Sequence, residues 1–149
     1  MKKILSNLFI CGCMLAAFFC LMACNNDLDV QQSYPFTVET MPVPNKVAKG
    51  ETVEIRCELK KEGSYAGTVY TIRFFQFEGA GTLKTENGII FQPNDRYLLE
   101  NEKFRLYYTS QSSEAQSFIV VVEDNNGQSF EMEFDFNNSD KEDDGQVDA

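Results

Sequence analysis

The sequence has 149 residues, a formal net charge of −10, and no histidine or tryptophan. This length suits one domain or at most two, and a hydrophobic content of 43% is typical of a globular chain. The absence of histidine excludes Ser-His-Asp triads, Cys-His dyads, imidazole bases and histidine-ligated metals.

The N-terminus is typical of a secretory signal. Two lysines stand near the start, and the apolar stretch 8–23 contains no charged residue. This stretch is shorter than the roughly 20 residues with which a helix spans a bilayer. It ends in Leu21-Met22-Ala23-Cys24, which resembles the lipobox of bacterial lipoproteins. We predict a lipoprotein signal peptide over 1–23 and lipidation of Cys24; the alternative is an ordinary signal in which Cys24 is incidental.

The residues that follow suggest a location. The stretch 25–29 is polar and acidic, which is compatible with lipid anchoring at the outer membrane, with a periplasmic or an outward orientation left open. Beyond the signal and Cys24, the sequence contains only Cys57, so an internal disulfide or a cysteine-rich zinc site is excluded. We predict a protein of the cell envelope whose exported domain is stable through its core alone.

Acidic residues outnumber basic ones by 23 to 13, and removal of the signal would take two lysines away. Direct binding to nucleic acid needs a basic patch that displaces counterions, and only the isolated pair Lys60-Lys61 stands out. We therefore predict no direct contact with nucleic acid. Proteins, basic ones included, or sugars are the expected partners, unless the acidity serves only solubility.

The composition divides the chain beyond the signal into three parts. We predict a flexible tether over 24–33, one β domain over 34–136, and a disordered acidic tail over 137–149. The tail lacks the spacing of a calcium loop, so solvation is its expected role.

Seven strand-like runs follow one another between tether and tail. The run 52–60 alternates most clearly, with Val53, Ile55, Cys57 and Leu59 on one side and charged residues on the other. The runs, in chain order, cover 35–39, 52–60, 69–77, a short strand around Leu83 followed by 89–91, then 104–109, 117–123 and 129–136.

Turn residues separate these runs at intervals of about eight to twelve residues, which is typical of an immunoglobulin-like antiparallel β-sandwich. Asn87-Gly88 and Asp124-Asn125-Asn126-Gly127 are the clearest turn signals. The disulfide and tryptophan of antibody domains are absent, and a small barrel is the structural alternative. No segment beyond the signal has helical periodicity.

Two runs are apolar on both sides, although a two-layer sandwich has only one interior. Phe75 and Phe77 oppose the inward set of the run 69–77, and Ile119 and Val121 oppose that of the run 117–123. We predict that these four residues form a candidate partner-binding patch. The alternative is that the tether, a loop or the segment Met41-Pro42-Val43-Pro44 covers them.

Arg96 and Tyr97 form a second candidate contact, because arginine and tyrosine are enriched at interface hot spots. The alternative is a turn at 93–96 with Tyr97 packed beneath it.

No residues point to catalysis. Cys57 lies on the apolar side of its run, as a buried thiol does, and no pair of carboxylates is singled out by a motif. The loop Gly79-Ala80-Gly81 lacks the pattern of a phosphate site. We expect neither enzymatic activity nor a cofactor or bound metal; a carboxylate-dependent hydrolase is the weakest alternative.

Several segments together resemble the TraQ family of transfer proteins from bacterial conjugative transposons, over about Asp27 to Asn138. The resemblance implies a role in moving a mobile element between cells, with proteins of the conjugation apparatus as partners, and no active-site residue comes with it. The segments that carry it are Tyr34-Pro35-Phe36-Thr37-Val38-Glu39, Met41-Pro42-Val43-Pro44, Gly50-Glu51-Thr52-Val53-Glu54-Ile55-Arg56, Tyr70-Thr71-Ile72-Arg73-Phe74-Phe75-Gln76, Pro93-Asn94-Asp95-Arg96-Tyr97 and Phe104-Arg105-Leu106-Tyr107-Tyr108-Thr109-Ser110.

These observations together predict an exported, membrane-anchored lipoprotein that serves as a non-catalytic accessory or scaffold in conjugative transfer through protein–protein contacts. The alternative from a different class is a cell-surface module that binds carbohydrate or acts as an adhesin.

Overall fold

The computed structural model describes residues 31–139, so the predicted signal peptide, Cys24, most of the tether and the tail beyond Ser139 lie outside the described residues. Within this range the regular structure consists of nine β-strands and no helix. The strands are β1 (Phe36–Thr40), β2 (Lys46–Val47), β3 (Thr52–Lys61), β4 (Tyr70–Glu78), β5 (Gly81–Thr85), β6 (Tyr97–Leu99), β7 (Lys103–Ser110), β8 (Gln116–Asp124) and β9 (Ser129–Asn138).

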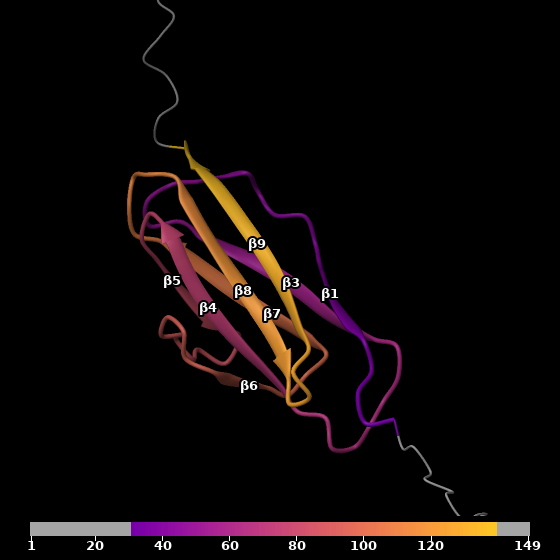
Figure 1. Cartoon of the computed structure of the whole chain (residues 1–149). Coiled ribbons are helices and arrows are strands. Elements are labelled where there is room, and N and C mark those ends of the chain that lie inside the picture. Colours follow the sequence, from indigo (N-terminus) through magenta and orange to yellow (C-terminus); the bar gives the residue numbers. More distant parts are fainter. Residues whose placement is uncertain (1–30, 140–149) are drawn as a thin grey trace, which may run out of the picture. The chain divides into compact units, whose positions relative to one another are not determined.

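The strands form two sheets (Figure 1). Sheet 1 has the order β1-β3-β7-β5, and sheet 2 has the order β2-β9-β8-β4-β6. When the two shortest strands are set aside, the other seven in chain order give the ABED and GFC sheets of an immunoglobulin domain. The prediction of an immunoglobulin-like β-sandwich is confirmed.

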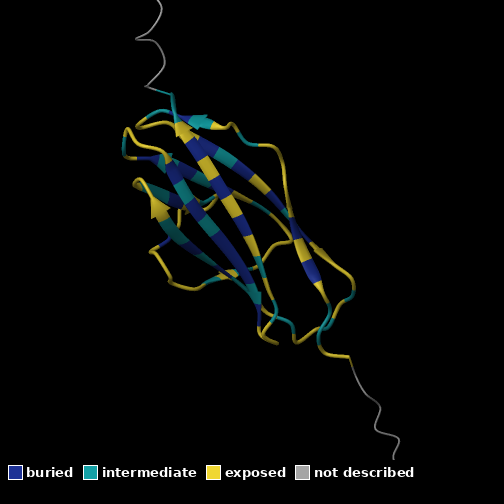
Figure 2. Ribbon diagram, turned by 45° about the horizontal axis from the view of Figure 1, so that its top comes forward, coloured by how far each residue is buried: buried dark blue, intermediate teal, exposed yellow. Residues whose placement is uncertain are grey.

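The core lies between the facing sides of the sheets, where alternate residues of the long strands are buried (Figure 2). In β3 the buried residues are Val53, Ile55, Cys57 and Leu59, as the alternation of the sequence predicts. The centre is aromatic: the Tyr108 ring stacks on Phe118 with centroids 4.2 Å apart, and Phe74 meets Phe118 edge-on at 5.5 Å.

The segment between β1 and β2 passes from sheet 1 to sheet 2. At its start the Met41 N–H donates to the Arg56 carbonyl at 3.0 Å, and at its end the Asn45 carbonyl accepts from the Asn137 N–H at 2.8 Å. It runs beside the edge of the sandwich (Figure 1), and Val43 packs against the core. The segment therefore closes the side of the core and is not a cover for the outer face of sheet 2.

Three details differ from the sequence-based expectation. β2 and β6 do not appear among the predicted runs, and the run 89–91 forms only an isolated bridge between Ile90 and Lys84. β9 extends to Asn138, two residues beyond the expected domain boundary, because its last two residues pair with β2 in parallel. The expected Asn87-Gly88 turn is present, with Gly88 at a φ of 83° that favours glycine.

Candidate interaction face

Groups with chemical reactivity give no site in the described part of the chain. Burial raises the pKa of the Cys57 thiol to about 12, so little reactive thiolate is present near neutral pH. Between residues 31 and 139, no three side chains of the metal-binding types gather closely enough to hold a metal ion. Nor does this range contain a helix long and apolar enough to span a membrane. The candidate sites are therefore surfaces.

The outer face of sheet 2 is built by the register of its three central strands. Phe75 of β4 lies opposite Ile119 of β8, which in turn lies opposite Glu133 of β9. The next row brings Arg73, Val121 and Glu131 together in the same way. Side chains at such paired positions point to the same side of a sheet, so these two rows share one surface.

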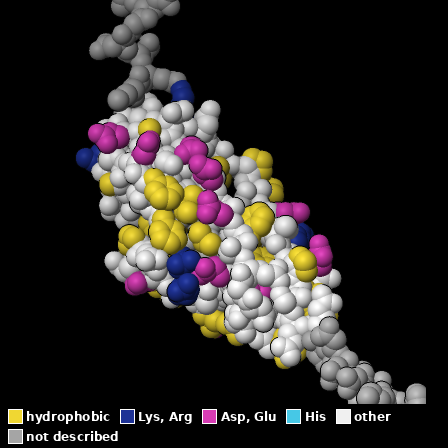
Figure 3. Space-filling view, viewed as in Figure 1, with side chains coloured by type: hydrophobic (Ala, Val, Ile, Leu, Met, Phe, Trp, Pro, Cys, Tyr) yellow, Lys and Arg dark blue, Asp and Glu magenta, His cyan; other side chains and the backbone are white. Residues whose placement is uncertain are grey.

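The register places Phe75, Ile119 and Val121 on this face, and with Phe77, the next outward residue of β4, we call them the apolar patch. Hydrophobic side chains gather on the face of the molecule that Figure 3 shows. Phe77 lies at a β-bulge near the end of β4 and is 64% exposed. Phe75 and Ile119 are half-buried, whereas Val121 is only 9% exposed and lies at the floor of the patch. The Arg73 guanidinium lies 5.3 Å from the centre of the Phe75 ring, within the range of a cation–π contact.

Arg96 and Tyr97 have different surroundings. Arg96 is exposed and its Nε lies 3.1 Å from the Glu123 carboxylate, which also accepts a 2.6 Å hydrogen bond from Arg73. The Tyr97 ring stacks on Phe91 at 4.6 Å, and its hydroxyl accepts a hydrogen bond from the Gln92 N–H at 2.8 Å. Arg96 therefore belongs to the outer face of sheet 2, whereas Tyr97 holds the adjoining loop in place.

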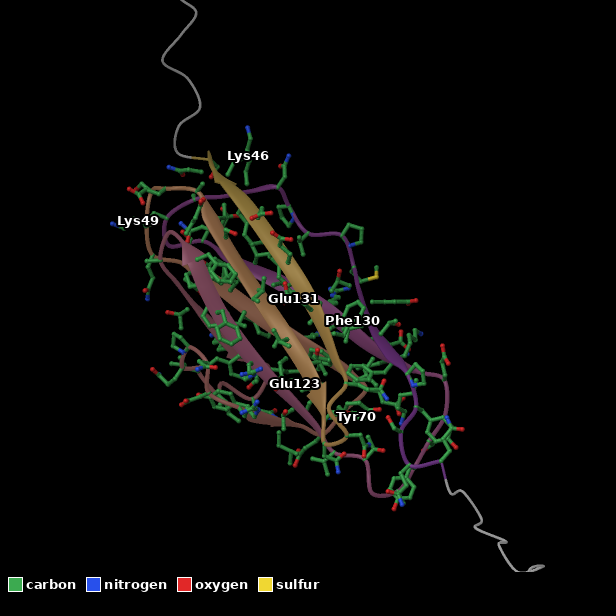
Figure 4. The ribbon with its side chains drawn as sticks, in the orientation of Figure 1. Lys46, Lys49, Tyr70, Glu123, Phe130 and Glu131 are labelled. Carbon is green, nitrogen blue, oxygen red and sulfur yellow. The ribbon has the colours of Figure 1, made fainter. Side chains whose placement is uncertain are left out.

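Beside the apolar patch, β9 carries three exposed carboxylates, Glu131, Glu133 and Asp135, which we call the acidic stripe. None of the three forms an ion pair or side-chain hydrogen bond with any residue in the described range 31–139. Figure 4 shows Glu131 on β9 and Glu123 near the end of β8. Glu123, unlike Glu131, pairs with two arginines, Arg73 and Arg96. As far as the described residues go, the β9 side of the face therefore carries carboxylates without cationic partners.

The outer face of sheet 1 has the opposite character. Glu54 pairs with Arg56 and Arg105, at 3.0 and 3.4 Å. Glu58 likewise pairs with Lys60 and Lys103, at 2.8 and 3.7 Å. The hydrogen bond from Arg56 lowers the pKa of the Glu54 carboxyl below its ordinary value, and the one from Lys60 does the same for Glu58.

The acidic stripe is a feature that the sequence analysis did not single out. The central outward positions of β3 alternate between acid and base, Glu54-Arg56-Glu58, whereas the charged outward positions of β9 are all acidic. The neighbouring outward positions of β8 are apolar, neutral polar or acidic and supply no cation. This difference in the outward charges of β3 and β9 is the feature of the sequence that could have indicated the acidic stripe.

The likeness to known proteins agrees with the fold. The model of the TraQ conjugal transfer protein family matches residues 7–139. The chain belongs to the TraQ family. The resemblance seen in the sequence is thereby confirmed, and it places the chain among proteins of conjugal transfer. No curated protein matches the chain.

Three solved structures from Bacteroides species are similar to this TraQ-family chain. A conjugative transposon lipoprotein of Bacteroides eggerthii is 76% identical, with a TM-score of 0.67, over 71% of this chain and 100% of that one. A conjugate transposon protein of Bacteroides vulgatus is 52% identical, with a TM-score of 0.65, over 83% and 99%. A lipoprotein of Bacteroides thetaiotaomicron is 47% identical, with a TM-score of 0.66, over 84% and 99%.

Proposed function

We propose that this TraQ-family protein is a lipid-anchored, non-catalytic component of a conjugative transfer apparatus, and that it works through protein contacts made by the outer face of sheet 2. The observation that carries the proposal is the asymmetry of the sandwich. The outer face of sheet 1 pairs Glu54 and Glu58 with neighbouring cations, whereas that of sheet 2 exposes Phe77 beside three carboxylates that have no cationic partner among residues 31–139. Exposed apolar residues next to charged ones are typical of interaction surfaces.

The anchor is proposed from the sequence and the relatives. The lipobox-like Leu21-Met22-Ala23-Cys24 precedes the domain, and two of the similar structures are named lipoproteins. More than one acyl chain holds a protein stably on a membrane. Cys24→Ser should abolish labelling of the protein by a radiolabelled or clickable fatty acid in growing cells. Labelling that persists in this variant would contradict anchoring at Cys24.

The interaction face is tested by transfer itself. Donor cells in which the double variant Phe77→Ser with Ile119→Ser replaces the natural protein should transfer the element at least about tenfold less often, because the loss of buried contacts of this size weakens a complex by that order. Protein levels in the envelope are measured in parallel, so that loss of the protein is not mistaken for loss of contact.

The matched control changes the other face. Glu39 of β1 is exposed, and its side chain approaches Lys60 only at 4.0 Å. Glu39→Lys should leave the transfer frequency within about twofold of the natural level, since exposed pairs contribute little. Equal frequencies for both sets of variants would contradict the assignment of the face.

The carbohydrate-binding alternative receives no specific support from the described residues. Sugar sites commonly combine an exposed aromatic ring with polar groups of that side chain or its neighbours, but the Tyr97 ring lies on Phe91 and the Tyr70 ring lies 5.1 Å from Phe36. The exposed Phe77 ring has no hydrogen-bonding group of its own. A screen of the processed protein against immobilised glycans distinguishes the two, because a specific glycan whose binding survives the Phe77→Ser and Ile119→Ser changes would favour the alternative.

A further inference from the structure

The backbone edge of β9 is open along most of its length. β9 pairs with β8 over its whole course, but on its other side β2 pairs only with Asn137 and Asn138. The segment that precedes β2 contains Pro42 and Pro44, which lack an N–H and cannot extend the ladder. Within the described residues, the stretch Ser129–Phe136 therefore has no strand hydrogen-bonded to it on this side, although β1 of sheet 1 comes close to β9.

The direction of the free groups follows from two hydrogen bonds. The Asn137 N–H donates toward β2, to the Asn45 carbonyl at 2.8 Å, and the Gln128 carbonyl accepts from Asp124 on the β8 side at 2.9 Å. Successive residues of a strand point their N–H and C=O groups to opposite sides. The odd-numbered residues of β9, including Glu131 and Glu133, thus present their backbone groups to the open edge.

The same residues carry the acidic stripe on the outer face of sheet 2. A strand that paired with this edge would place every second side chain beside those carboxylates. The intervening side chains would point toward the side of the core, where Phe130 and Val43 are only partly buried. An added strand would therefore match both surroundings if its side chains beside the acidic stripe were cationic and its side chains toward Phe130 and Val43 were apolar.

Charge decides which occupant fits. A second copy of this chain, edge to edge, would bring two acidic stripes together, and like charges in directly opposed positions are destabilising. The tether and the C-terminal tail of the chain itself are also predominantly acidic. The occupant must therefore be basic and belong to another protein.

Resting on the proposed function, we propose that the open edge of β9 binds an extended segment of a partner protein in which Lys or Arg alternates with apolar residues, and that this segment adds a strand to sheet 2. Backbone pairing to Glu131 and Glu133 holds it, and the acidic stripe selects it. The apolar patch lies on β8 and β4, on the other side of the acidic stripe, and contacts the rest of the partner.

The test uses the processed, lipidated full chain in detergent micelles and three synthetic peptides. The first alternates Lys and Val, the second alternates Glu and Val, and the third is the Lys/Val peptide with alternate backbone nitrogens methylated along one edge. We expect the first to bind at least about tenfold more tightly than either of the others, a tenfold ratio corresponding to about 1.4 kcal/mol. Amide hydrogen exchange at Glu131 and Glu133 should slow only with the first peptide.

Two variants separate the backbone contribution from the charge. Glu133→Pro removes an N–H that points to the open edge while the ladder with β8 stays complete, and it should weaken binding of the Lys/Val peptide at least about tenfold. Glu131→Gln with Glu133→Gln keeps both N–H groups and should weaken binding and reduce its dependence on salt. The matched control is Glu39→Lys on sheet 1, which should bind as the natural chain does.

Each contrary result is decisive. Equal binding of the methylated peptide, or equal binding of the Glu/Val peptide, would overturn strand addition, as would unchanged exchange at Glu131 and Glu133. If Glu133→Pro fails to fold, the methylated peptide and the double glutamine variant still decide the question. The peptides could show no selective binding while the donor with Phe77→Ser and Ile119→Ser still transfers the element less often. That result would contradict strand addition and leave the proposed function intact.

Discussion

The two outer faces of the sandwich differ in how they arrange the polar and charged groups that face water. Each must present polar groups to water over a sheet whose other side is apolar. The outer face of sheet 1 does so with opposite charges on neighbouring positions, such as Glu54 between Arg56 and Arg105. The outer face of sheet 2 separates its components into the apolar patch, the acidic stripe and the Arg73–Glu123–Arg96 cluster.

The difference teaches where an interaction surface can arise in this fold. A charged group of a partner protein gains little binding free energy from a surface charge that is already paired. It must replace the existing ion pair and lose its own hydration. Glu131, Glu133 and Asp135 have no cationic partner in the part of the chain that the structure describes, so a cationic partner would displace no existing ion pair there. The outer face of sheet 1 thus satisfies many of its charges itself, and the outer face of sheet 2 is the one for which we propose a partner.

The largest effect concerns the two sides of β4. Phe74 is 2% exposed and lies among the core rings, whereas Phe77 is 64% exposed on the outer face. Phe74→Ala should lower the free energy of unfolding by about 3–5 kcal/mol through the cavity it leaves, and Phe77→Ala should change it by less than about 0.5 kcal/mol. Urea unfolding followed by circular dichroism measures both. Similar losses for the two variants would show that Phe77 belongs to the core.

A smaller effect compares an arginine from each outer face. The Arg73 and Glu123 side chains are about one-fifth exposed and joined at 2.6 Å, while Arg56 is 58% exposed. Arg73→Ala should cost about 1–3 kcal/mol, because it leaves a partly buried carboxylate with less compensation, whereas Arg56→Ala should cost at most about 0.5 kcal/mol. Chemical unfolding again measures these free energies. The loss for Arg73→Lys should lie between those for Arg73→Ala and Arg56→Ala, because lysine keeps the positive charge but lacks the planar guanidinium. A larger loss for Arg56→Ala would reverse the comparison.

The smallest expected effect is a loss of folding stability at low pH, which arises from Glu54 and Glu58. The folded-state pKa values of Glu54 and Glu58 lie below their ordinary values because Arg56 and Lys60 donate hydrogen bonds to them. The resulting contribution to stability is therefore present above the unfolded pKa of about 4.3 and is lost as the pH falls through the lower folded values. Side-chain carboxyl shifts in NMR titrations report each value. In the Arg56→Gln variant the pKa of Glu54 should rise toward its ordinary value; an unchanged pKa would show that the pair has no influence.

The long strands could be predicted from the sequence because their periodicity comes from burial on one side. β3 and β9 alternate cleanly, and their structure follows that pattern. β2 and β6 could not be predicted, because two or three residues carry no periodicity and these strands exist through their partners on β9 and β4. The run 89–91 looked like a strand, but Phe91 is buried against Tyr97 while Ile89 and Ile90 remain half-exposed.

The candidate face was predictable in part for the same reason. Apolar residues on both sides of two runs indicated Phe75, Phe77, Ile119 and Val121, and the register brings them together. Their depth was not predictable: Val121 lies between Arg73 and Glu131 in the register and is buried, which depends on neighbours distant in sequence. The open edge of β9 likewise depends on where β2 stops, and no local pattern shows that.

The pairing of β2 with the end of β9 has a consequence for a protein that is exported. Lys46, near the beginning of the domain, lies opposite Asn137, near its end. A chain that crosses a membrane from its N-terminus onward cannot form this last contact until its final strand has emerged. Before β9 pairs, one edge of the strongly apolar strand β8 would have no strand hydrogen-bonded to it, and this edge could associate with other chains. Pairing of β9 with β8 and β2 is thus the last step that completes the two sheets, whichever strands form before it.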